Sequence, residues 1–281
     1  MRALTRTGVV LVLAAFICVG LVQAGLVRNP FAPALKGDVA LARSSDRAGL
    51  RVLFVGNSFT FSNSMPALVH QLEAADEGAP PFFVAEYTRG GWTLEDASRD
   101  DGLASLLGEM RWDVVVVQEQ SQLLSFPPEQ RRDESYPFAR ALQREISSAG
   151  GQTVLFMTWG YREGDPGNYP GDTFTAMQLR LAEGYSDLGV ELPAPVAPVG
   201  LAWAEALQRE PALDLWDVDG EHPNAAGSYL AACVFYAMLS GRNPSGSEYM
   251  AGLEPAEARF LQDVAWDVVS ANRESLGSVT G

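Results

Sequence analysis

The sequence predicts an α/β domain in which a mainly parallel, five-stranded sheet lies between two layers of helices. Short apolar runs alternate along the chain with segments whose apolar residues recur at helical spacing. The run Val114 to Val117 is four valines in succession, and such continuous apolar strands suit a parallel sheet covered on both faces. Strands that alternate with helices in this way predict a three-layer α/β/α sandwich.

The expected strands span residues 50–55, 82–88, 112–117, 153–158 and 190–199. The first four are short apolar runs that stop at glycine or polar residues. The fifth is interrupted by prolines, which cannot donate to a sheet ladder, so we expect it at a sheet edge.

The expected helices span residues 65–77, 94–110, 136–149, 174–188, 201–208, 225–239 and 255–272. The first carries Pro66, which suits a first helical turn, and Gly150-Gly151 closes the third. Residues 161–172 hold three glycines and two prolines and form a long connection, which is typical of a binding loop.

The first 24 residues have the pattern of an export signal. Arg2 and Arg6 precede an acid-free apolar run, and Val22-Gln23-Ala24 offers the small residues that a signal peptidase needs. The alternative is an uncleaved membrane anchor, because the apolar run can be extended through Val27. We therefore expect residues 1–24 to direct the protein out of the cytoplasm, 25–49 to be a flexible tether, 50–274 the folded domain and 275–281 a tail.

Composition fits one large domain and excludes some partners. The 281 residues are 47% hydrophobic, which is ample for a core. The formal charge of −15 argues against a nucleic-acid partner and against an anionic membrane surface as ligand. Removal of the export segment would leave Cys233 alone, so an internal disulfide is excluded and Cys233 is most simply a buried small hydrophobe.

Ser58 is the first candidate for chemistry. The strand from Leu50 breaks at Gly56-Asn57-Ser58, and a helix follows. Ligands of open α/β sheets bind at the carboxyl ends of strands, so a serine at this place can be a nucleophile. For an isolated pair, the simpler interpretation is that Asn57 and Ser58 only end the strand and start the helix.

The far end of the chain supplies a base for that hydroxyl. Serine is a poor nucleophile until a base takes its proton, and the usual base is a histidine held by a carboxylate. His222 lies three residues after Asp219, and Pro223 keeps it in a loop before the next helix. The other histidine, His70, lies mid-helix and is interpreted as a surface residue.

Four short blocks together resemble the SGNH (GDSL-like) hydrolase family of serine esterases. They are Gly56-Asn57-Ser58, Gly90-Gly91, Gln118-Glu119-Gln120-Ser121 and Asp219-Gly220-Glu221-His222-Pro223. The resemblance implies a flavodoxin-like sheet, with Ser58 attacking an ester carbonyl, His222 as its base and Asp219 orienting the imidazole ring. No cofactor and no metal are implied.

The resemblance also implies an oxyanion hole with one unusual donor. Family members use the backbone N–H of the serine, a glycine N–H of the second block and an asparagine amide of the third. The first two map onto Ser58 and Gly91. The third block has no asparagine, and Gln118, with Gln120 as second choice, is the candidate amide, as in some carbohydrate O-acetylesterase relatives with a Q-x-x-S pattern.

Three aromatic residues at or after the fourth strand are candidates for substrate contacts. Trp159, Tyr161 and Tyr169 lie in or beside the long connection, where aromatic side chains can face a substrate. The alternative is that they pack on the surface of the domain.

The sequence thus predicts an exported serine ester hydrolase, most simply an O-acyl or O-acetyl esterase acting on a carbohydrate or another small ester. One alternative is a non-catalytic module that binds a glycan or a protein through the same cleft. Another is a metal hydrolase built on Asp217, Asp219, Glu221 and His222, although a single histidine among close carboxylates lacks the ligand spacing of a catalytic zinc site.

Overall fold

The structure is a computed structural model that describes residues 32–37, 49–276 and 279. The chain divides into two units, Met1–Pro33 and Ala34–Gly281, and every element described below lies in the second. The expected export segment and most of the expected tether lie outside the described residues. Among the residues described, no helix is both long enough and apolar enough to cross a membrane.

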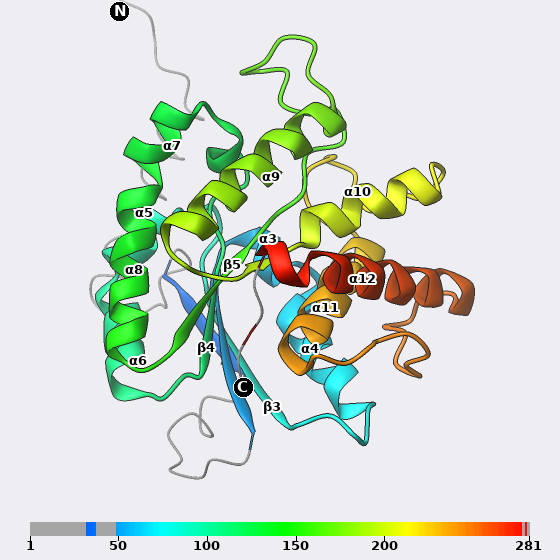
Figure 1. The fold of residues 1–281 in the computed structure, drawn as a ribbon, viewed down its shortest axis with the longest axis horizontal. Coiled ribbons are helices and arrows are strands. Elements are labelled where there is room, and N and C mark those ends of the chain that lie inside the picture. The colour runs from blue at the N-terminus through cyan, green and yellow to red at the C-terminus, as the bar shows by residue number, and fades with distance from the viewer. Residues whose placement is uncertain (1–31, 38–48, 277–278, 280–281) are drawn as a thin grey trace, which may run out of the picture. The chain divides into compact units, whose positions relative to one another are not determined.

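One mixed sheet of six strands organises the second unit (Figure 1). Its strands, in the spatial order β1-β3-β2-β4-β5-β6, are β1 (Ala34–Gly37), β3 (Phe82–Thr88), β2 (Leu50–Gly56), β4 (Val114–Val117), β5 (Gln152–Phe156) and β6 (Val196–Ala197). All neighbouring pairs are parallel except β1 with β3. Without β1 the order is flavodoxin-like, as expected.

The sixth strand, β1, corrects the expectation of five. It comes from the stretch expected to be a tether, and it lies antiparallel to β3 with Lys36 opposite Glu86. The two side chains form an ion pair at 2.8 Å. The two apolar side chains of this strand, Ala34 and Leu35, are adjacent and give no period-2 pattern, so pairing with β3 rather than the local sequence determines this edge strand.

Helices cover both faces of the sheet, which confirms the three-layer α/β/α sandwich (Figure 1). In Figure 1, α5 (Leu94–Ser98), α6 (Asp101–Glu109) and α8 (Tyr136–Ser148) lie on one face, and α4 (Met65–Ala74), α11 (Ala225–Ser240) and α12 (Pro255–Leu276) on the other. The remaining helices are α3 (Ser58–Phe61), α7 (Pro128–Glu134), α9 (Phe174–Glu191) and α10 (Val199–Arg209), with 3-10 turns η1 (Ser62–Ser64) and η2 (Leu123–Ser125).

Two expected elements differ in extent. The expected helix 94–110 is divided because Asp100 leaves helical geometry, and its side chain accepts a hydrogen bond from Leu103 N to cap α6. The expected strand 190–199 pairs with β5 only at Val196–Ala197, because α9 continues to Glu191. Its place at a sheet edge is as predicted.

Helix α11 is the centre of the core on one face of the sheet. Its residues from Ala226 to Leu239 are buried all round. Phe235 packs edge-on against Phe54 of β2 and Phe156 of β5, with ring centroids 5.0 and 4.8 Å apart. Cys233 is a buried free thiol whose pKa is raised by burial, in agreement with its expected role as a small hydrophobe. Helix α11 begins at Ala225, after His222, Pro223 and the capping residue Asn224.

Candidate active site

Ser58 stands at the carboxyl edge of the sheet, at the start of α3. Asn57 caps this short helix, since its Oδ1 accepts from Phe59 N at 3.0 Å. Its Nδ2 donates to the carbonyl of Trp92 at 2.9 Å and so ties the serine turn to the loop of Gly90 and Gly91. Asn57 therefore has the structural role considered from the sequence, while Ser58 remains half-buried with its hydroxyl toward the histidine loop.

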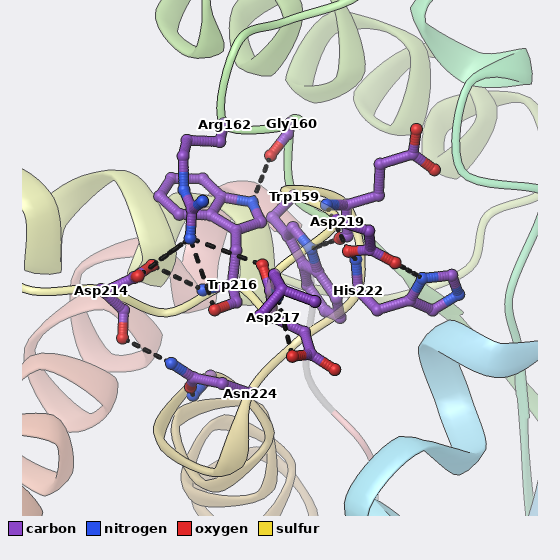
Figure 2. Close-up of polar contacts among 12 residues, drawn as sticks. Trp159, Gly160, Arg162, Asp214, Trp216, Asp217, Asp219, His222 and Asn224 are labelled. Atoms are coloured by element: carbon purple, nitrogen blue, oxygen red, sulfur yellow. Dashed lines mark hydrogen bonds and ion pairs between the residues drawn. The ribbon is translucent and has the colours of Figure 1, made fainter.

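Three side chains form one hydrogen-bonded series. Ser58 Oγ lies 2.7 Å from His222 Nε2, and His222 Nδ1 lies 2.6 Å from Asp219 Oδ2. The other carboxylate oxygen of Asp219 accepts from the backbone N–H groups of Glu221 and His222, both at 2.9 Å. Figure 2 shows the carboxylate of Asp219 facing the imidazole ring. With Nδ1–H donated to Asp219, Nε2 is left to accept the serine proton.

The Asp219 carboxylate is held in its ionised form. Its partial burial favours the neutral acid, but hydrogen bonds from Glu221 N and from the ring and backbone of His222 outweigh burial. The pKa of Asp219 consequently lies below its ordinary value. An ionised carboxylate at this place fixes the ring orientation and can stabilise the imidazolium that forms when His222 takes a proton.

The loop that carries Asp219 is braced by Arg162, which the sequence analysis did not identify (Figure 2). The guanidinium pairs with Asp214 at 2.7 Å and lies 5.6 Å from the ring centroid of Trp216. Arg162 N donates to the carbonyl of Gly220 at 2.8 Å, at the turn where Gly220 has φ +74°. No local pattern marks Arg162, because its partners lie more than fifty positions further along the chain.

Trp159 is a buried residue that holds the histidine loop through the backbone of Glu221. Its side chain is completely buried and stacks between Phe59 and Trp203, with centroids 4.8 and 4.2 Å apart. Its Nε1 donates to the carbonyl of Glu221 at 3.0 Å (Figure 2). The structure thus contradicts the substrate-facing role expected for Trp159, because its indole is buried between two other aromatic rings.

The other two aromatic candidates also have partners within the chain. Tyr161 is nearly buried, which raises its pKa to about 12, and its hydroxyl lies 2.6 Å from Ser121 Oγ. Tyr169 is half-buried, donates to the carbonyl of Ser125 at 3.3 Å and stacks with Arg180 at 4.0 Å. Tyr161 therefore contacts the third block, whereas Tyr169 retains an exposed part.

The side chain of Gln118 stabilises the turn that carries Ser58. Its Oε1 accepts from Asn57 N and from Thr60 Oγ1, both at 2.9 Å, and its Nε2 donates to the carbonyl of Glu119. A Cβ on Gly56 would lie 2.5 Å from this amide oxygen, so glycine is needed for the close approach. The structure contradicts Gln118 as the first choice for the oxyanion hole, because its amide is buried and its polar atoms are already bonded within the chain.

Gln120, the second choice, is the better candidate for the amide donor. It is half-buried, and its Nε2 has only a long contact of 3.3 Å to Ser121 Oγ. Its Oε1 accepts from Gln122 N at 2.8 Å, which orients the NH₂ group away from that backbone. Ser121 in turn contacts Tyr161, so the Q-x-x-S block is a connected hydrogen-bond series.

Backbone N–H groups of Ser58 and Gly91 complete the candidate hole. Ser58 is the first residue of α3, where an N–H has no partner within the helix. Gly91 adopts φ +71°, and a Cβ there would meet nothing within 4 Å, so this edge is open. Within the described part of the chain, neither N–H makes a hydrogen bond.

Glu119 is a buried carboxylate that joins the third block to the starts of α5 and α8. Its Oε1 accepts from Leu94 N at 3.0 Å and Gln120 N at 2.7 Å, while Oε2 accepts from Ser135 Oγ at 2.5 Å. Burial raises its pKa to about 7, and these three hydrogen bonds only partly oppose the shift. The sequence analysis quoted Glu119 in the third block but gave it no role.

The structure also bears on His70 and on the alternative of a metal site. His70 is on α4, where it pairs with Glu73 at 3.2 Å. Across the residues with described positions, no three or more His, Cys, Asp or Glu side chains are arranged to hold a metal ion.

Comparisons with solved structures identify the fold. A DUF4886 family protein from Bacteroides uniformis has a TM-score of 0.69 at 19% identity, covering 79% of this chain and 95% of its own. A candidate SGNH hydrolase from Slackia heliotrinireducens has a TM-score of 0.57 at 28% identity, covering 68% and 99%. The chain has the SGNH hydrolase fold.

A third structure of similar fold is LAE5, an α/β hydrolase enzyme from the metagenome of Lake Arreo, Spain. Its TM-score is 0.51 at 16% identity, over 68% of this chain and 94% of its own. Neither a protein-family model nor a curated protein matches the sequence. In the SGNH fold of this chain, the four sequence blocks lie at the carboxyl edge of the sheet or in the loop that precedes α11.

Proposed function

We propose that this chain is a serine ester hydrolase in which Ser58, His222 and Asp219 form the catalytic triad. The observation that carries the proposal is the uninterrupted series from Ser58 Oγ to His222 Nε2 and from Nδ1 to Asp219. The SGNH hydrolase fold supports hydrolase activity in general. A binding module would not need a hydroxyl, an imidazole and an ionised carboxylate in this order.

The chemistry proceeds in two halves. His222 Nε2 takes the proton of Ser58 Oγ as the oxygen attacks the ester carbonyl, and the negative charge moves to the carbonyl oxygen. N–H groups of Ser58 and Gly91 and the amide of Gln120 stabilise that charge. His222 then gives its proton to the departing alcohol. Water, activated by the same imidazole, releases the acyl group as an acid and restores Ser58.

An O-acyl or O-acetyl group on a carbohydrate is the substrate class we propose. The open surface at Gly91 and the half-buried positions of Ser58 and His222 support a bulky polar alcohol beside a small acyl group. The Q-x-x-S pattern of the third block supports the same class. Glu221 and Asp217 are exposed beside the histidine and make this rim acidic, which favours neutral over anionic substrates.

A substrate panel with matched variants tests the proposal. Purified protein from Arg28 onward is assayed with short-chain nitrophenyl esters and with acetylated sugars. We expect Ser58→Ala, His222→Ala and the double variant to fall to one similar low rate, because triad residues act as a unit. Wild-type rates in all three variants would reject the proposal. Binding of acetylated sugars without turnover by the wild type would favour the non-catalytic module.

We also propose that the protein is exported, with residues 1–24 removed or retained as an anchor. The support is the sequence pattern of Arg2, Arg6 and the apolar run alone. Mass spectrometry of the protein from cells should find Gly25 at or near the amino terminus. An intact Met1 in the membrane fraction would indicate an anchored enzyme, and an intact Met1 in the cytosol would exclude export.

A further inference from the structure

We propose that Asn63 is a positioning residue that holds the nucleophile segment and the histidine loop at the correct separation. This inference rests on the proposed function of Ser58 and His222. Asn63 lies in η1, five residues after Ser58 and between α3 and α4. None of the four sequence blocks contains it.

The side chain of Asn63 reaches across to the histidine loop. Its Nδ2 donates to the carbonyl of Pro223 at 2.9 Å and to Ser228 Oγ at 2.9 Å. Pro223 directly follows His222, and Ser228 is a buried residue in the first turns of α11. One amide group thus joins segments that are 160 and 165 positions apart in the sequence.

Ser228 also contacts the residue that precedes Asn63. Ser228 Oγ lies 3.4 Å from the carbonyl of Ser62, the residue before Asn63. The short segment after α3 is therefore fixed at two neighbouring residues to the start of a buried helix. Because α11 is buried from Ala226 to Leu239, this anchor belongs to the packed core.

The backbone at Asn63 is independent support for a constrained role. Asn63 has φ 51° and ψ 23°, and Ser64 has φ 55° and ψ 41°. Two consecutive residues other than glycine in the left-handed region are strained, and such strain persists only where surrounding contacts determine the conformation. Ser64 makes no capping hydrogen bond with its side chain that could hold this conformation, whereas Asn63 next to it makes two side-chain hydrogen bonds.

These contacts bear directly on the catalytic distance. Ser58 Oγ and His222 Nε2 are 2.7 Å apart, but the two residues are 164 positions apart in the sequence. Asp219 orients the imidazole ring within its own loop, whereas Asn63 joins that loop to the serine segment. Loss of the Asn63 amide should lengthen or misalign the contact between serine and histidine, which slows acylation with little effect on substrate binding.

Three variants separate the amide from the backbone conformation. Asn63→Gly accepts the left-handed conformation but removes the amide. Asn63→Asp keeps size and shape but places an acceptor opposite the carbonyl of Pro223, so it cannot donate. Ser64→Gly relieves the same kind of backbone strain one residue later and removes no contact to the histidine loop, which makes it the matched control.

Steady-state kinetics with a short-chain nitrophenyl ester give the decisive measurement. We expect kcat of Asn63→Gly to fall about tenfold or more, with KM changed less than about twofold. Asn63→Asp should lose at least as much, and Ser64→Gly should keep the wild-type kcat. Thermal unfolding of each variant is measured in parallel, and folded Asn63→Gly with reduced kcat distinguishes positioning from loss of structure.

Three results would overturn the inference in different ways. If Ser58→Ala abolishes activity but Asn63→Gly turns over like Ser64→Gly, the proposed function stands and the positioning role is wrong. If Ser58→Ala retains the wild-type rate, the proposed function fails and this inference fails with it. An increase in KM with constant kcat in Asn63→Gly would also reject a role in the serine–histidine contact.

Discussion

Replacing Glu119 with glutamine should remove a pH dependence from the stability of the folded chain. Glu119 is buried and has no cation among its hydrogen-bond partners, which are Leu94 N, Gln120 N and Ser135 Oγ. Burial raises its pKa from 4.5 to about 7 in the folded state. The folded chain therefore keeps this proton over a pH range in which the unfolded chain has released it.

The magnitude follows from the width of that range. Where the unfolded state binds one proton fewer than the folded state, the free energy of unfolding falls by about 1.4 kcal/mol per pH unit. Between pH 4.5 and about 7 the Glu119 carboxyl therefore contributes a fall of roughly 3 kcal/mol. Its stabilising contribution is complete below pH 4.5, is lost as pH rises toward 7, and changes no further above that.

Glutamine at position 119 can keep the observed contacts without the charge. Its Oε1 can accept from both backbone N–H groups, and its Nε2 can donate to Ser135 Oγ. Glu119→Gln should then match the wild type near pH 4.5 and exceed it by up to about 3 kcal/mol at pH 8.

Urea unfolding at pH 5, 6, 7 and 8 measures the difference. Glu129→Gln, which neutralises an exposed carboxylate of α7, is the control and should follow the wild-type pH dependence. Parallel pH curves for wild type and Glu119→Gln would refute the reasoning, as would a Glu119→Gln variant that is less stable than the wild type at pH 8.

Three further predictions concern the site. Gln120→Ala should lower kcat by about a hundredfold with unchanged thermal stability, since it removes one oxyanion donor. Gln118→Ala should chiefly lower the melting temperature, because it leaves buried donors unpaired. The reverse pattern would restore Gln118 as the donor. Arg162→Ala should lower kcat about tenfold through the Asp219 loop. The control Arg209→Ala, which breaks similarly exposed ion pairs within α10 and from α10 to α12, should not lower kcat. Equal kinetics in the two variants would exclude bracing by Arg162. Dialysis against a strong chelator should leave the rate unchanged, because the nucleophile is a side chain; activity that returns only with added zinc or calcium would contradict this.

Local sequence patterns predicted the parts of the candidate site that lie close together along the chain. Asp219 and His222 are three residues apart, and the Gly56-Asn57-Ser58 turn follows a strand whose apolar run is unmistakable. Val114 to Val117 likewise predicted a central strand, because a run buried on both faces is apolar at every position. Such patterns depend on residues that are close together along the chain, so they can be read without knowledge of the fold.

Contacts between distant segments could not be predicted in the same way. The family resemblance of the third block predicts Gln118 as the oxyanion-hole amide, but only the fold shows that its amide oxygen accepts from Asn57 and Thr60 in the turn and helix after β2. Trp159 was placed on a binding loop, yet its indole fills the space between Phe59 and Trp203. Both residues lie at the expected places along the chain, but their side chains are buried in the domain instead of facing a substrate.

β1 shows the same limit for the fold. Ala34–Gly37 has no alternating pattern, and it becomes a strand because the free edge of β3 accepts it. A strand determined by its partner leaves little signal in its own sequence, since β propensity depends on context.

The most direct test of the central claim is the identity and reactivity of the nucleophile. A fluorophosphonate, which is attacked by activated serines, is incubated with the wild type and with His222→Ala, and the adduct is located by peptide mass spectrometry. The account predicts one adduct per chain on the peptide that contains Ser58, with labelling slowed by about a hundredfold or more in His222→Ala. An adduct on another residue, or equal labelling of Ser58 in both proteins, would contradict it.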